Sequence, residues 1–179
     1  MLSLPELRRV AETLPGLLEG ARLRALAQIG DHALYLRFHV PGGEQGGVRH
    51  ELCLSVHPET ARIGRVASRP PAPSPPPPFA AYLRAHLDRA RFAGARLVGE
   101  DRQLAIALET REASYELVLS TLGPRSNLYL LDGAGVLRAA LRPLADTRRD
   151  LALGEPFRSP EGSPPRAGED RFAAASGAA

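Results

Sequence analysis

The chain has 179 residues, a formal net charge of +3, and 23 basic residues that are all arginine. This length suits one domain with loose ends, and the single cysteine, Cys53, excludes an internal disulfide and a cysteine-rich zinc site. No apolar run reaches membrane-spanning length, so we expect a soluble, cytoplasmic protein with no membrane contact.

The first predicted element is a helix, because Ser3-Leu4-Pro5-Glu6 has the Ser-x-x-Glu form of a capping box. Apolar residues follow at helical spacing to about Leu14, where Pro15-Gly16 is expected to disturb the helix. Alternating apolar and polar residues then predict an antiparallel meander of three strands. We expect these strands at residues 23–29, 34–38 and 51–56, with a hairpin loop at 41–47.

Seven of the ten residues at positions 69–78 are prolines, which leaves few backbone donors for a helix or a sheet. We expect a stiff, extended bridge between two halves of one domain, with a docking site for a proline-binding partner as the alternative. A short basic helix is predicted after it, at about residues 80–89. This helix is expected to pack at the junction of two sheets.

Five short apolar segments follow the helix, separated by glycine, aspartate or charged turns. They are typical of further antiparallel strands and lie at residues 92–98, 103–108, 115–119, 128–131 and 136–141. The sequence therefore predicts an α+β fold of two packed antiparallel sheets with flanking helices. Apolar periodicity ends near Gly154, so we expect one domain at 1–158 and a disordered tail or linker at 159–179.

Positive charge is concentrated between Ala61 and Arg102, where eight arginines and three acidic residues give a local excess of +5. A phosphate-rich partner fits this excess, and a solvated arginine-rich surface is the alternative. The candidate nucleic-acid contacts, expected on one positive face, are Arg62, Arg84, Arg89 and Arg96.

Patterns of catalytic or metal-binding residues are absent from the sequence. The five histidines have no second ligand at metal spacing, and no glycine-rich phosphate loop precedes a helix. Ser55 and His57 share one face of a strand without forming a triad. We therefore expect a protein that is not an enzyme and that binds no metal, cofactor or small-molecule substrate.

Asp101 and Arg102 are neighbours at the start of a predicted strand. Neighbouring strand residues face opposite sides of a sheet, so at least one of the two charges faces solvent or a partner. Arg102 could fork onto a phosphate or stack on a base, while Asp101 orients it or accepts from a ribose or base. A structural ion pair that fixes the strand start is the alternative.

Several motifs follow one another at compatible distances: Leu54-Ser55-Val56-His57-Pro58-Glu59-Thr60-Ala61-Arg62-Ile63, Gly99-Glu100-Asp101-Arg102 and Gly123-Pro124-Arg125-Ser126-Asn127-Leu128. Together they resemble the N-terminal domain of the NFACT family, also known as fibronectin-binding protein A homologues, over about residues 2–160. The resemblance implies a fold similar to the N-terminal domain of formamidopyrimidine-DNA glycosylases. It also implies a ribosome quality-control factor that binds the large ribosomal subunit with peptidyl-tRNA and recruits tRNA for C-terminal alanine tailing of stalled nascent chains.

The family's Asp-Arg motif is tied to tRNA recruitment and maps onto Asp101 and Arg102. One departure is the segment Ser120-Thr121-Leu122-Gly123-Pro124-Arg125, where relatives usually have Glu before Met-Gly-Arg. The coiled-coil arms and RNA-binding domain of full-length members are also missing, so we expect a fragment or a shortened homologue.

Two other functions are the alternatives. The first is a nucleic-acid enzyme of the DNA-glycosylase type, but the catalytic proline of those enzymes is the free amino terminus, whereas Pro5 follows four residues here. The second is a fibronectin-binding surface adhesin, against which the lack of a secretory signal pattern counts.

Overall fold

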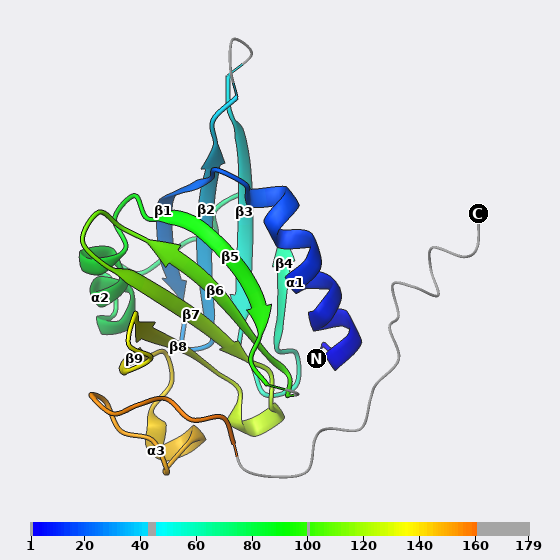
Figure 1. Cartoon of the computed structure of the whole chain (residues 1–179). Helices are drawn as coiled ribbons and strands as arrows, with labels where there is room; N and C mark the ends of the chain where they lie inside the picture. Colours follow the sequence, from blue (N-terminus) through cyan, green and yellow to red (C-terminus); the bar gives the residue numbers. More distant parts are fainter. Residues whose placement is uncertain (1, 43–45, 100, 161–179) are drawn as a thin grey trace.

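The computed structural model describes residues 2–42, 46–99 and 101–160 (Figure 1). The elements within these residues are α1 Leu4–Leu18, β1 Arg22–Ile29, β2 Ala33–Val40, β3 Val48–Ser55, β4 Arg62–Arg65, α2 Pro78–His86, β5 Arg91–Leu97, β6 Gln103–Glu109, β7 Ser114–Ser120, the 3-10 helix η1 Gly123–Arg125, β8 Asn127–Asp132, β9 Leu137–Ala140 and α3 Leu144–Thr147. All but the first two residues of the predicted tail at 159–179 lie outside the described residues.

The capping box predicted for α1 is confirmed. Ser3 Oγ accepts a hydrogen bond from Glu6 N at 3.4 Å, and Glu6 Oε2 accepts one from Ser3 N at 2.7 Å. The expectation that the helix is disturbed at Pro15 is wrong, because α1 continues to Leu18. Proline removes one backbone hydrogen bond, but continuing the helix buries Leu18 on the same face as Leu14.

The predicted meander is confirmed by antiparallel pairing of β2 with both β1 and β3. Part of the predicted hairpin loop, residues 43–45, lies outside the described residues. The sequence did not predict β4, which pairs antiparallel with β3 along Leu52–Ser55. Two exposed arginines and a glycine hide this strand, since only Ile63 gives an apolar signal.

The strands form one antiparallel sheet in the order β4-β3-β2-β1-β5-β6-β7-β8-β9. The α+β class is confirmed, but strand pairing is continuous where the sequence predicted two sheets. The two halves meet at a narrow seam between β1 and β5, where one residue pair, Arg22 and Arg91, is in register. No local pattern marks such a seam, because it depends on where distant strands meet.

The narrow seam allows the halves to pack against one core, as their crossing in Figure 1 shows. The rings of Phe38 on β2 and Phe92 on β5 meet edge to face with centroids 6.4 Å apart. Helix α1 packs mainly on β5, and α2 packs on β1 and β9, which agrees with the predicted position of the basic helix. The similarity to the glycosylase domain stays a prediction.

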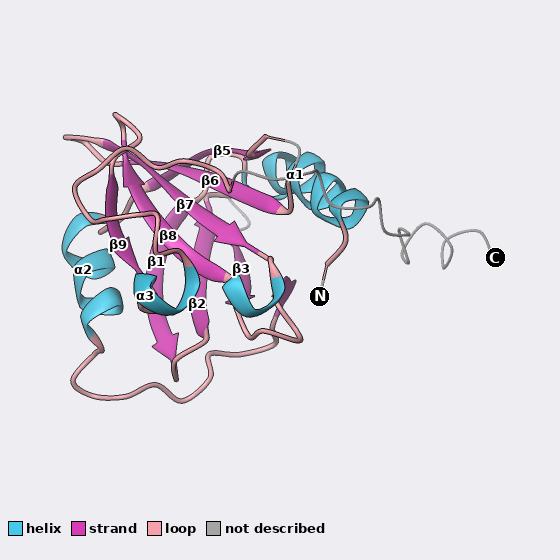
Figure 2. Cartoon of the chain, turned by 90° about the horizontal axis from the view of Figure 1, so that it is seen from below, coloured by secondary structure: helices cyan, strands magenta, loops and turns pink. Residues whose placement is uncertain are grey.

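Two connections outside the strands position the candidate site. Residues 69–77 form neither helix nor strand, and the loop that contains them runs from β4 to α2 (Figure 2). The segment after β9 folds back, so that Leu144, Leu151 and Phe157 cover Tyr129 and its neighbours on the second face of the sheet. This return places α3 beside the β7–β8 connection. Within the described residues, every helix is too short or too polar to be a membrane span.

Candidate nucleic-acid interface

Asp101 and Arg102 lie in the turn between β5 and β6, and both are partly exposed. Asp101 Oδ1 accepts a hydrogen bond from Arg102 N at 2.7 Å, and Asp101 O accepts one from Gln103 N at 2.8 Å. The carboxylate therefore bonds to the backbone of its own turn, which holds the first residues of β6 in place.

The backbone of Arg102 is attached to the connection between β7 and β8. Arg102 O accepts hydrogen bonds from Thr121 N at 2.9 Å and from Thr121 Oγ1 at 3.2 Å. Thr121 is fully buried, so this attachment lies beneath the surface. The turn that carries the Asp-Arg pair is consequently fixed to the segment that contains Arg125.

Buried polar side chains are concentrated at this end of the sheet. Ten of the described polar or charged residues are buried, and seven of them lie at the ends of β6, β7 and β8 or on and just after α3: Gln103, Ser120, Thr121, Ser126, Asn127, Thr147 and Arg148. Buried polar groups cost free energy unless they are hydrogen-bonded. The side chains of Thr121, Asn127, Thr147 and Arg148 make such bonds, whereas the Gln103 amide and Ser126 Oγ have no partner among the described residues.

Asn127 is the centre of this polar layer. Its Nδ2 donates to Arg142 O at 3.0 Å and to Thr147 Oγ1 at 2.9 Å. Its Oδ1 accepts from Leu128 N and Arg142 N, both at 2.8 Å. The amide thus makes the four hydrogen bonds that an asparagine side chain can make, and these tie α3 and the loop before it to β8.

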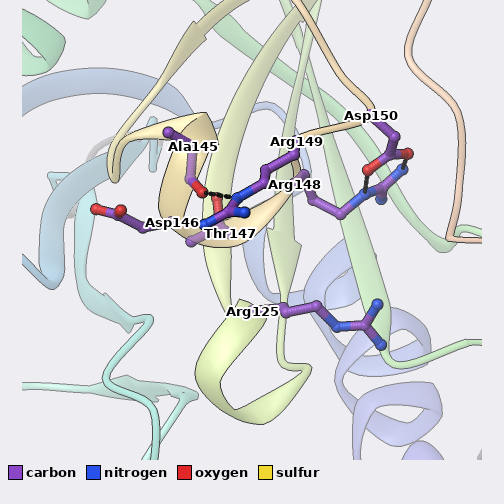
Figure 3. Close-up of a pocket in the computed structure, with 7 residues that line it drawn as sticks. All are labelled: Arg125, Ala145, Asp146, Thr147, Arg148, Arg149 and Asp150. Atoms are coloured by element: carbon purple, nitrogen blue, oxygen red, sulfur yellow. Dashed lines mark hydrogen bonds and ion pairs between the residues drawn. The ribbon is translucent and has the colours of Figure 1, made fainter.

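An open hollow of ≈ 450 Å³ lies beside α3 and η1 (Figure 3). We call it the α3 hollow, and its lining residues are Arg125, Ala145, Asp146, Thr147, Arg148, Arg149 and Asp150. Arg148, 4% exposed, donates from Nε and Nη2 to the two oxygens of Asp150 at 2.7 and 2.5 Å. Arg149 Nε donates to Ala145 O at 2.8 Å, and Arg125 is exposed.

Electrostatic coupling joins the α3 hollow to the Asp-Arg turn. The hydrogen bond to Asp150 is the largest influence that raises the pKa of Arg148, and the charge of Asp101 also contributes. Conversely, the hydrogen bond from Arg148 lowers the pKa of Asp150, and the charge of Arg125 adds to that effect. The charge of Asp101 is the smallest of these influences, so the turn has a weak electrostatic effect on the α3 hollow.

Of the other predicted contacts, the structure brings two together. Arg84 and Arg89 line a second hollow of ≈ 430 Å³. Arg62 lies on edge strand β4, on the opposite side of the molecule from α2 (Figure 1), and Arg96 makes a bidentate pair with Glu116 across the sheet. Neither residue lines this hollow. Nucleic-acid binding by Arg62 and Arg96 stays a prediction.

Sequence reasoning selected Asp101 and Arg102 but missed Arg148 and Arg149. Residues 142–150 carry no apolar period, so nothing local predicted α3 there. The one feature of this segment that could have indicated a binding site is the pair of adjacent arginines, Arg148 and Arg149. Chemically, the assembled site offers guanidinium donors for an anion and carboxylate acceptors for hydroxyl or amino groups. No group of three metal-ligating side chains gathers within the described residues.

The sequence pattern of the family described as "NFACT N-terminal and middle domains" matches residues 5–174. The chain is 27% identical over 164 residues to the Rqc2 homolog RqcH of Bacillus subtilis, covering 84% of this chain and 28% of that protein. It is 30% identical over 131 residues to the archaeal Rqc2 homolog aRqcH of Methanocaldococcus jannaschii, covering 73% and 19%. It thus spans less than a third of the length of these curated relatives.

Solved structures share the fold at 21% identity. The N-terminal part of the fibronectin/fibrinogen-binding protein of Streptococcus suis superposes with a TM-score of 0.77, covering 91% of this chain and 62% of that one. The N-terminal domain of fibronectin-binding protein PavA of Streptococcus pneumoniae gives the same TM-score, with 97% and 67% covered. At this identity the likeness concerns the fold alone.

Proposed function

Because this chain belongs to the NFACT family, we propose that it is a tRNA-binding module of a ribosome quality-control factor. In this proposal it binds tRNA on the large ribosomal subunit with peptidyl-tRNA and supports C-terminal alanine tailing of the stalled nascent chain, in the cytoplasm. It is a binding protein and not an enzyme. The curated relatives that it matches are more than three times longer.

The observation that carries the proposal is the attachment of the Asp101–Arg102 turn to the α3 hollow. Guanidinium groups bind phosphate oxygens through paired, charge-assisted hydrogen bonds, so Arg102, Arg125 and Arg149 are suited to an RNA backbone. The carboxylate of Asp101 adds an acceptor that suits a ribose 2′-hydroxyl or a base amino group. In this proposal the arginines supply affinity for phosphate and Asp101 supplies discrimination between ligands, which is the chemistry of a recognition surface and not of a catalytic site.

Preorganisation of this surface supports the proposal. Arg142 Nη1 donates to Pro124 O at 3.1 Å and to Ser126 O at 2.6 Å, which fixes the 3-10 turn that carries Arg125. Asn127 fixes α3 on the other side of the hollow. A rigid surface spends less binding free energy on ordering side chains and loops when it takes up a ligand.

The pair of buried Arg148 and exposed Asp150 has a different role in the proposal. Asp150 neutralises Arg148, which also donates from Nη2 to Arg158 O at 2.9 Å. Breaking such a pair leaves a buried charge without compensation, so its function is to hold the floor of the hollow. The exposed Arg125 and Arg149 then carry the charge that meets the ligand.

A competition titration tests the proposal. The 179-residue chain should bind bulk tRNA more tightly than duplex DNA of equal length at two salt concentrations, and both affinities should fall as salt rises. A preference that persists at the higher salt supports recognition of tRNA, because phosphate contacts alone do not distinguish the two. Equal affinity for both nucleic acids would reduce the function to nonspecific binding and contradict the tRNA assignment.

A further inference from the structure

A second arginine-rich hollow lies beside α2, and we call it the α2 hollow. Its nine lining residues are Leu23, Arg24, Ala25, Leu26, Arg69, Arg84, Leu87, Asp88 and Arg89. Four of them are arginines and one is acidic, so the hollow is more strongly positive than the α3 hollow, where three arginines face two acids. A concave site lined by one sign of charge concentrates its field on a ligand of the opposite sign.

Three segments far apart in the sequence supply these arginines. Arg24 lies on β1, Arg69 begins the proline bridge, Arg84 is on α2, and Arg89 follows α2. The bridge therefore does more than connect β4 to α2, because its path brings Arg69 to the rim of the hollow. Arg69 was not among the contacts that the sequence predicted, and its place could not be read from local periodicity.

Two of the arginines are fixed through the backbone. Arg84 Nη2 donates to Leu26 O at 3.1 Å, which uses one of the five N–H donors of its guanidinium. Arg89 has a φ of 52°, and its carbonyl accepts from Arg22 Nη1 at 3.4 Å. Few residues other than glycine adopt this φ, so the surrounding structure determines the position of Arg89.

Acidic residues neutralise little of the positive charge in the α2 hollow. Among the described residues, the one ion pair that its lining makes joins Arg89 Nε to Asp88 Oδ2 at 4.0 Å, with side chains 74% and 82% exposed. An exposed pair at this distance contributes little and is screened by salt. No described carboxylate pairs with Arg24, Arg69 or Arg84.

We propose that the α2 hollow binds backbone phosphates of RNA as a contact separate from the Asp101–Arg102 turn. This inference rests on the proposed function, which supplies RNA as the polyanion that this chain meets. Apart from its charged side chains the hollow offers leucine and alanine, and these do not read base edges. Binding there strengthens affinity without selecting sequence, while recognition stays with the turn.

The test compares two double variants of the full chain. Arg24→Gln with Arg69→Gln removes two charges from the α2 hollow, and Arg8→Gln with Arg111→Gln removes two charges from exposed residues outside it. Affinities for bulk tRNA and for a uridine homopolymer of about 20 nucleotides are measured at about 50 and 200 mM salt. Two lost phosphate contacts should reduce the slope of log affinity against log salt by roughly 1.4 to 1.8.

With this reduced slope, the α2 double variant should lose about tenfold less affinity than the wild type between the two salt concentrations, for both RNAs. The control double variant, Arg8→Gln with Arg111→Gln, should keep the wild-type slope. Equal slopes for the two double variants would overturn the inference, since the hollow would then be ordinary solvated surface. Circular dichroism checks folding of each variant, and Arg84→Gln, which retains an amide donor, provides a second substitution in the same hollow. It should lower the slope by roughly 0.7 to 0.9.

Two further results decide whether the ligand is RNA and whether the α2 hollow acts apart from the turn. Poly-glutamate that competes as well as the homopolymer, charge for charge, would assign the hollow to an acidic protein and overturn the RNA proposal. Loss of the tRNA preference in Arg102→Ala, with unchanged slopes in the α2 variants, would leave the proposed function standing and defeat the inference. Lowered salt slopes in the α2 variants, together with an unchanged tRNA preference in Arg102→Ala, would support phosphate binding in the α2 hollow. They would contradict tRNA recognition by the Asp101–Arg102 turn.

Discussion

Arg102 is anchored by Thr121, whose amide nitrogen and Oγ1 both donate to the Arg102 carbonyl, at 2.9 and 3.2 Å. These bonds join the turn between β5 and β6 to the connection between β7 and β8. The position of the Arg102 side chain therefore depends on a buried threonine 19 residues further along the chain.

Thr121→Val tests whether this anchor positions Arg102. Valine keeps the shape of threonine and its backbone N–H donor but lacks the hydroxyl that also donates to the Arg102 carbonyl, so the free energy of unfolding should fall by roughly 0.5 to 1.5 kcal/mol. Affinity for tRNA should fall as well, by less than in Arg102→Ala, because the guanidinium is kept but less well placed. Chemical denaturation and a tRNA titration measure the two effects. An unchanged tRNA affinity in Thr121→Val would show that the hydroxyl bond does not position Arg102.

Asn127→Leu should be among the more destabilising single substitutions in the chain. It removes an amide that makes four hydrogen bonds and leaves their partners, including Arg142 O and Thr147 Oγ1, to find others. Unsatisfied buried groups cost about 1 to 3 kcal/mol each and do not add fully, so a loss of roughly 3 kcal/mol is expected. At about 2 to 4 °C per kcal/mol, the melting temperature should fall by roughly 6 to 12 °C.

Asn127→Asp serves as the matched control, because aspartate keeps the acceptor for Leu128 N and Arg142 N and loses the two donors. Its melting temperature should lie between those of the wild type and Asn127→Leu. Equal melting of all three proteins would show that the polar layer does not hold α3.

Much of the fold could be predicted from local patterns, and the failures have a common cause. The capping box at Ser3 and the meander were predictable, since side-chain spacing alone specifies a helix start and alternating strands. The continuation of α1 through Pro15, the seam at Arg22 and the position of α3 were not, because each depends on contacts between segments distant in sequence. The same holds for the candidate site, because the sequence pattern selected Asp101 but gave no sign that its charge acts on Arg148.

Gly16 and Gly20 form a pair in which backbone conformation can be tested alone. A Cβ added at either glycine meets no atom within 4 Å, but Gly20 has a φ of +71° and Gly16 lies inside α1. Gly16→Ala should therefore raise the free energy of unfolding by about 0.5 to 1 kcal/mol, through better helix propensity. Gly20→Ala should lower it, because alanine is strained at positive φ. Urea denaturation of both variants would contradict this account if their shifts had the same sign.

Asp132 should make stability depend on pH under acidic conditions. Hydrogen bonds from Val136 N first, and then from Arg138 and Ala134 N, lower its pKa below the ordinary value of 3.8. A carboxyl with a lowered folded-state pKa contributes stability above its unfolded pKa, and that contribution is lost as the pH falls through the folded value. The melting temperatures of the wild type and Asp132→Asn should therefore differ near neutral pH and converge below about pH 4.

Arg138→Gln separates the causes of this shift, because it leaves the backbone donors in place. As the pH falls, the difference in melting temperature between Arg138→Gln and the wild type should change less than the difference between Asp132→Asn and the wild type. A constant difference between the wild type and Asp132→Asn at every pH would show that Asp132 stabilises the turn independently of its charge.

The most direct test of the central claim is tRNA affinity in Arg102→Ala and Asp101→Ala chains, measured beside circular dichroism and thermal melting. Removing a charge-assisted phosphate contact should cost roughly 1.5 to 3 kcal/mol of binding, or about 10- to 150-fold in affinity, with about 1 kcal/mol or less of stability lost. Asp101→Ala should have a weaker effect if the acid only positions the turn, and an equal one if it contacts the tRNA. Both variants melting several degrees early, with wild-type tRNA affinity in the folded fraction, would make the pair a structural latch and contradict the account.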